Sequence, residues 1–159
     1  MDEAERIRSL ERDVENKKEE RDSLNESANG WRIERESLNA EVKKTIAEAN
    51  EYREERDEYN WKVKDAKERG DYSEVRANAE LAQAAHDMMK SLYDRADSLR
   101  KDADDAHNNF IECKEDADIA HKEFLELIQI AKESKKEVEK PKKTESVKTK
   151  DDTRRYHWF

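Results

Sequence analysis

Three histidines are the residues of this chain with the most obvious chemistry, because imidazole is a common metal ligand. Each follows an alanine, and they stand at His86, His107 and His121. The steps between them are 21 and 14 residues, which amount to about 31 and 21 Å along a helix. Side chains so far apart cannot share one ion, so we expect no metal site and a structural role for the histidines.

The C-terminal residues form a second chemical feature, a basic segment that ends in aromatic side chains. Residues 132–159 carry a net charge of +4, which leaves −13 for the rest of a chain whose total is −9. Basic groups suit phosphate contact and aromatic rings suit base stacking, so this tail is a candidate RNA-binding segment. Its candidate residues are Lys142, Lys143, Lys148, Lys150, Arg154, Arg155, Tyr156, His157, Trp158 and Phe159. The alternative is a solubilising tail whose aromatic rings dock back on the helices.

No catalytic constellation accompanies these features. The chain has 42 acidic residues, but without a cleft to shift their pKa values they are typical of a solvated surface. There is no glycine-rich phosphate loop, no pair of cysteines separated by two residues, and no set of residues that would pair a catalytic nucleophile with a general base. Cys113 is the only cysteine and is interpreted as a small core residue. We therefore expect a protein that is not an enzyme and needs no cofactor.

A repeated motif must position the three histidines. The pattern Glu-Arg-(Asp/Glu)-(Ser/Glu)-(Leu/Tyr)-Asn occurs at 20–25, 34–39 and 55–60, in steps of 14 and then 21 residues. The Ala-His pairs repeat in the mirror order, 21 and then 14. Both steps are whole heptads, and mirrored spacing is what two helices running antiparallel past each other require. The two halves of the chain are thus predicted to pair.

Heptads continue through both halves and break only once. Apolar and small residues hold most of the a and d positions from Ile7 to Ala66 and again from Val75 to Ala131, and the three motif arginines also stand at a. Between them lies Gly70, which suits a helix C-cap, followed by Asp71, which suits the next N-cap. The predicted fold is all-α: a long antiparallel coiled-coil hairpin over 1–139, with helices at about 3–68 and 72–138 and a turn at Gly70-Asp71. An irregular basic tail, 140–159, follows.

Composition agrees with a narrow buried stripe. Charged residues make up 47% of the chain and hydrophobic residues only 33%, as in coiled coils and unlike a globule with a wide core. No apolar run approaches the roughly 20 residues that span a bilayer. We expect no membrane contact and a cytoplasmic location.

Folding the chain at 70–71 places residue i opposite residue 141 minus i, so that the motif arginines meet small residues. The asparagines and histidines then lie at e positions and lean toward one another. We predict three clasps that fix the register, with guanidinium heads reaching solvent. Their members are Arg21, Asn25 and His121; Arg35, Asn39 and His107; and Arg56, Asn60 and His86.

Several bulky side chains fall outside the a and d stripe and are candidate partner contacts. Trp61 is at an outer f position, near Tyr72 and the predicted turn. The alternative for Trp61 is packing along a neighbouring lysine stem. Leu125, Ile128 and Ile130 widen the stripe at the open end, which indicates a third element there: the tail, a second copy or a partner helix.

Parts of the chain resemble an archaeal coiled-coil family. These are residues 55–64 and the Ala-His-x-x-Phe-(Ile/Leu)-Glu pattern at 106–112 and 120–126. Members are often labelled phosphoserine phosphatase, and they have been compared with the eukaryotic Bfr1-type coiled coils of messenger ribonucleoproteins. The phosphatase label finds no support, since no Asp-x-Asp loop follows a strand. The resemblance implies a role near ribosomes or RNA.

Together these features predict a factor that binds the ribosome, its RNA or another ribonucleoprotein, with the tail on RNA and the helices as a brace or spacer. Translation regulation and ribosome hibernation are roles of this kind. The alternative is a protein-only scaffold or homodimeric adaptor, which would bind through the open end and Trp61.

Overall fold

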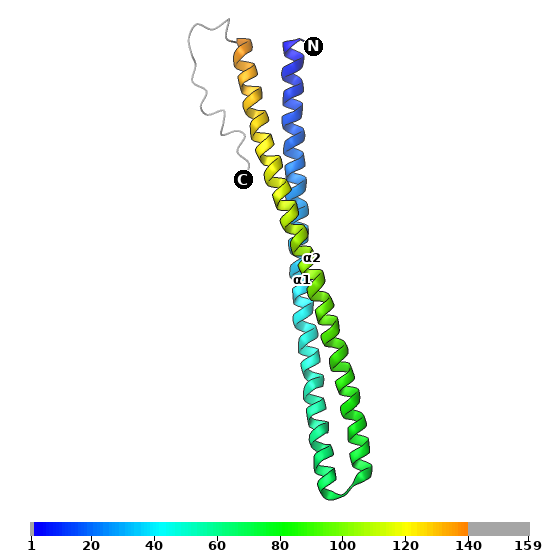
Figure 1. The fold of residues 1–159 in the computed structure, drawn as a ribbon. Coiled ribbons are helices and arrows are strands. Elements are labelled where there is room, and N and C mark those ends of the chain that lie inside the picture. Colours follow the sequence, from blue (N-terminus) through cyan, green and yellow to red (C-terminus); the bar gives the residue numbers. More distant parts are fainter. Residues whose placement is uncertain (1, 140–159) are drawn as a thin grey trace. The chain divides into compact units, whose positions relative to one another are not determined.

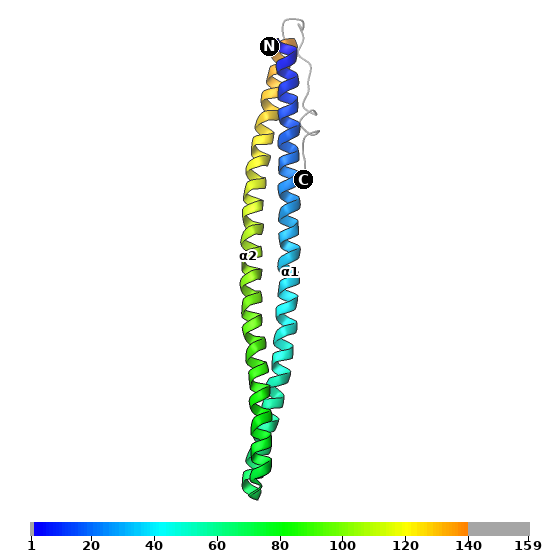
Figure 2. The ribbon, with the colours of Figure 1, turned by 90° about the vertical axis from the view of Figure 1, so that its right-hand side faces the viewer.

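Two long helices, α1 (Glu3–Arg69) and α2 (Tyr72–Glu139), make up the computed structural model, and they pack against each other as a hairpin (Figures 1 and 2). The structure describes residues 2–139. The predicted fold class is confirmed, and the predicted helix bounds lie within one residue of those observed. The tail residues predicted to bind RNA, within 140–159, lie outside the described residues.

The hairpin divides into two units, each containing part of both helices. The open-end unit comprises the described residues 2–30 and 110–139, and the turn unit comprises 31–109.

The turn has the predicted glycine and N-cap. Gly70 has φ of 72°, the left-handed conformation that glycine adopts without a Cβ penalty. Its N–H donates to the carbonyl of Lys67 (3.1 Å), and the N–H of Asp71 donates to the carbonyl of Ala66 (3.0 Å). The Asp71 carboxylate then accepts the N–H of Glu74 at 3.2 Å. These bonds satisfy two of the last carbonyl groups of α1 and one of the first N–H groups of α2.

The two glycines allow a paired stability test. Gly70→Ala should lower the free energy of unfolding by about 1–2 kcal/mol, because an L side chain is strained at positive φ. Gly30→Ala should raise it by about 1 kcal/mol, because Gly30 is helical, a Cβ there meets nothing within 4 Å, and alanine is the better helix former. Urea unfolding, monitored by circular dichroism, measures both changes in the free energy of unfolding. If both substitutions stabilised the protein, or both destabilised it, this account of the turn would be contradicted.

The buried apolar side chains follow the predicted heptads, and most are alanines. In the turn unit they are Val42, Ala49, Ala66, Ala82, Ala85, Met89, Ala96, Ala103 and Ala106. In the open-end unit they are Ala28, Ala117, Ala120, Phe124, Ile128 and Ala131. All except Ile128 stand at a or d. Small residues let the helix backbones approach closely, and close packing of this stripe holds each helix pair together.

Trp31 departs from its expected place. It occupies a d position, where the heptads predict a buried side chain, yet it is 38% exposed. An indole ring is too large for a seam whose buried positions are mostly alanine, so part of the ring stays in solvent.

Candidate functional site

Each predicted clasp contains a contact between its arginine on α1 and its histidine on α2, where the sequence had predicted the asparagine against the histidine. In each, an arginine Nη1 donates to a histidine Nδ1. The distances are 3.0 Å for Arg21–His121, 2.7 Å for Arg35–His107 and 3.4 Å for Arg56–His86. A guanidinium can only donate, so each Nδ1 is the acceptor. The first contact lies in the open-end unit and the other two lie in the turn unit.

The head of Arg21 does not reach solvent, and that part of the prediction is wrong. Arg21 is only 4% exposed. Its guanidinium carbon lies 4.9 Å from the centroid of the Phe124 ring, and its Nε and Nη2 donate to the Asp22 carboxylate at 3.0 and 2.8 Å. The Phe124 ring also stacks on His121, with centroids 6.1 Å apart. A cation held by a carboxylate, an imidazole and a ring face is stabilised within the seam.

The residue after each arginine decides how the rest of its guanidinium is held. Asp57 accepts from Nε and Nη2 of Arg56 at 3.1 and 3.0 Å, as Asp22 does for Arg21. After Arg35 the residue is Glu36, whose carboxylate instead accepts from Arg32 at 2.9 Å. The Nε of Arg35 is buried without a hydrogen bond. The longer glutamate side chain thus reaches one turn back along the helix and leaves its neighbour.

The asparagine part of the predicted clasps is not shown. Asn25 accepts a hydrogen bond from the Lys114 ammonium at 3.4 Å, an unexpected partner. Asn39 and Asn60 lie on the exposed surface, and their lean toward the histidines stays a prediction.

Two further contacts between the helices were not predicted. The Tyr93 hydroxyl donates to the Asn50 side chain at 2.5 Å. Tyr93 stands at an e position, as the three histidines do. Its heptad position could therefore have predicted a contact with α1. Lys17 bridges Glu20 at 2.8 Å and Glu123 at 3.4 Å. The hydrogen bond that the Lys17 ammonium donates to Glu20 raises the pKa of Lys17 above its ordinary value, and so do its hydrogen bond to Glu123 and the negative charge of that carboxylate.

The exposed candidates fall in both units. In the turn unit, Trp61 is 64% exposed and Tyr72 is 76% exposed, and the nearby Lys62 ammonium lies over the Tyr59 ring at 5.4 Å. In the open-end unit Leu125 and Ile130 are exposed at 39% and 46%.

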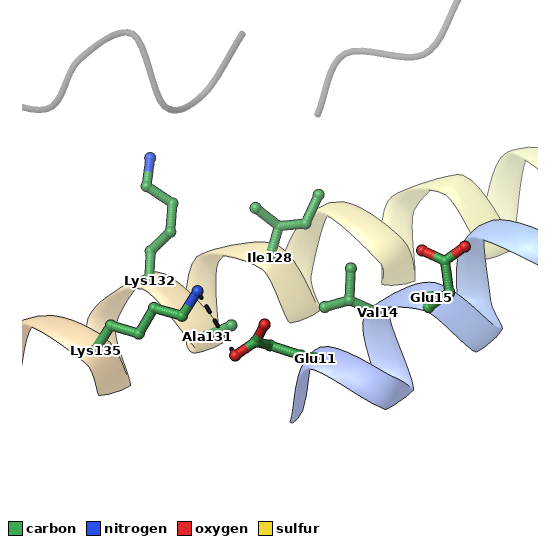
Figure 3. Close-up of a pocket in the computed structure, with 7 residues that line it drawn as sticks. All are labelled: Glu11, Val14, Glu15, Ile128, Ala131, Lys132 and Lys135. Atoms are coloured by element: carbon green, nitrogen blue, oxygen red, sulfur yellow. Dashed lines mark ion pairs between the residues drawn. The ribbon is translucent and has the colours of Figure 1, made fainter. Parts of the chain in front are cut away.

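Ile128 differs from these candidates because it is only 6% exposed. Its predicted role as a partner contact stays a prediction. The side chain lies at the edge of the seam, in a shallow hollow with Val14 of α1 (Figure 3).

Among residues 2–139, no three His, Cys, Asp or Glu side chains lie where they could hold a metal ion. Neither described helix contains a stretch long and apolar enough to cross a membrane. Cys113 is half-buried with a free thiol, at the d position predicted for it.

Comparison with known proteins identifies the family. A family model described as a family of unknown function, DUF7121, matches residues 5–74 and 72–157. The chain belongs to this family. The two matched segments correspond to the two helices and meet at the turn between them. No curated protein and no solved structure matches the chain.

Proposed function

We propose that this protein is a non-enzymatic cytoplasmic factor that associates with the ribosome or another ribonucleoprotein. The basic tail contacts RNA, and the paired helices act as a brace or spacer that carries the tail. The observation that carries the proposal is the distribution of charge. Residues 140–159 contain seven Lys or Arg and three Asp or Glu, a net charge of +4, whereas residues 1–139 carry −13. Association with RNA releases counterions from phosphates only where cations contact them.

The helices carry an excess of acidic residues, and several of their lysines and arginines already pair with carboxylates, which favours the tail as the RNA contact. One hollow between α1 and α2 is lined by Glu20, Asp116 and Glu123, and Lys17 already bridges two of these acids. A surface of this charge repels phosphates. The helices therefore support a bracing role, and the tail supplies both the sign and the stacking rings for RNA.

Sedimentation of ribosomes from lysate tests the proposal. The full chain should co-sediment at low salt and be released as salt rises, and a chain ending at residue 139 should stay in the soluble fraction. Replacing Lys142, Lys143, Lys148 and Lys150 with glutamine should flatten the slope of log affinity against log salt by up to about 3, since each single-strand phosphate contact contributes about 0.7.

The matched control replaces four exposed helix lysines with glutamine: Lys43, Lys44, Lys64 and Lys67. This variant loses the same charge, yet it should keep the wild-type salt slope. If the full chain and the chain without 140–159 are both absent from the ribosome fraction at every salt concentration, the proposal is rejected.

A further inference from the structure

One surface of the open-end unit is built differently from the rest of the helix pair. We name it the open-end face, and its residues are Glu11, Val14 and Glu15 on α1 and Leu125, Ile128, Ala131, Lys132 and Lys135 on α2. All except Leu125 line a hollow of about 230 Å³ (Figure 3).

The apolar residues of this face exceed what two helices need. A two-helix seam uses a and d positions, and Ala131 at a belongs to it. Ile128 stands at e and Leu125 at b, which adjoin each other on one side of α2. Ile128 is buried, but Leu125 is still 39% exposed. Apolar side chains spreading from a to e and b widen the stripe toward a further helical partner.

Charge on the open-end face is separated by helix. α1 contributes Glu11 and Glu15, and α2 contributes Lys132 and Lys135 (Figure 3). Within the chain, Lys135 and Glu11 pair at 3.7 Å, with side chains 45% and 53% exposed. Such exposed pairs contribute little to stability, so the arrangement calls for another explanation.

A surface with acids on one helix and lysines on the other is complementary to itself. A two-fold axis parallel to the helices places α1 of one copy against α2 of the other, so that Glu11 and Glu15 face Lys132 and Lys135 in both directions. A two-fold axis across the helices would instead set acids against acids. Electrostatic complementarity of this kind selects the partner and its orientation.

From this face we infer that the open-end unit binds a second copy of the same chain. The two copies run parallel and bring four helices together over this unit. Leu125 of each copy is covered, and each α1 carboxylate pair meets the lysine pair of the other copy. This dimer goes beyond the proposed RNA contact and does not depend on it.

Charge reversal distinguishes contacts between copies from those within one chain. Wild type should show twice the chain mass of 18.9 kDa by sedimentation equilibrium. E11K/E15K makes the open-end face all positive and K132E/K135E makes it all negative, so each variant alone should be a monomer. An equimolar mixture of the two should recover the doubled mass, because opposite faces then meet.

An apolar substitution with a matched control completes the test. Leu125→Glu should give a monomer, whereas Ile33→Glu, at a 53% exposed position of the turn unit, should leave the doubled mass unchanged. Helical circular dichroism should be the same in all variants. No RNA is present, so the result is independent of ribosome binding.

Three results would overturn the inference. The first is a wild-type monomer at the highest soluble concentration. The second is a dimer that none of the open-end variants affects. The third is a monomeric full chain that dimerises only when residues 140–159 are removed, because the tail and not a second copy would then cover the face.

Discussion

Phe124→Ala should remove about 3–5 kcal/mol from the free energy of unfolding, the cost typical of truncating a buried phenylalanine. Phe124 is 1% exposed and is the one large side chain that is fully buried among the described residues. Its neighbours at the buried a and d positions of α2 are Ala117, Ala120 and Ala131. Alanines cannot move into the space of a missing ring, so the cavity remains. The loss also removes the ring face beneath Arg21.

Urea unfolding of the variant and of wild type measures this effect. Two substitutions serve as controls. Phe124→Leu keeps most of the apolar volume and should lose considerably less. Phe110→Ala truncates the same side chain at a half-buried position and should also cost less. A loss below about 1 kcal/mol for Phe124→Ala would mean that the ring does not occupy the seam as described, since buried truncations cost several times more.

The fold was predictable because two independent patterns agree on it. Heptads required long helices, and the mirrored spacing of the Arg and His motifs required them to be antiparallel. The predicted pairing set residue i opposite 141 minus i. Arg21–His121, Arg35–His107 and Arg56–His86 all join residues whose numbers sum to 142. A difference of one residue is expected when side chains at e reach a positions diagonally across a seam.

Side-chain burial was less predictable, because periodicity assigns a face and says little about volume. Trp31 and Arg21 both occupy seam positions, yet the apolar indole is part exposed and the charged arginine is buried. The difference lies in the neighbours: Arg21 has a ring, an imidazole and a carboxylate around it. Ile128 was assigned to a partner only because it is apolar and stands outside the a and d positions. The tail has no periodicity at all, so only its charge and aromatic content could be interpreted.

Arg21→Ala should cost about 2–4 kcal/mol, because it removes a buried side chain and charge-assisted hydrogen bonds together. Arg21 is 4% exposed and holds His121 at 3.0 Å. A double-mutant cycle separates the contact from the packing. If the Arg21–His121 contact is itself stabilising, Arg21→Ala and His121→Ala together should cost less than the sum of the two single losses, by about 1 kcal/mol or more.

The Arg56–His86 contact is the matched control for that cycle. It has the same atoms and sequence motif, but its hydrogen bond is 3.4 Å long and the Arg56 side chain is 26% exposed. Water competes with a longer, more open contact, so its coupling energy should be about 0.5 kcal/mol or less. Equal coupling in the two cycles would show that burial by Phe124 adds nothing to the clasp. A larger coupling at Arg21 would mean that identical sequence motifs contribute unequally, according to the ring beneath them.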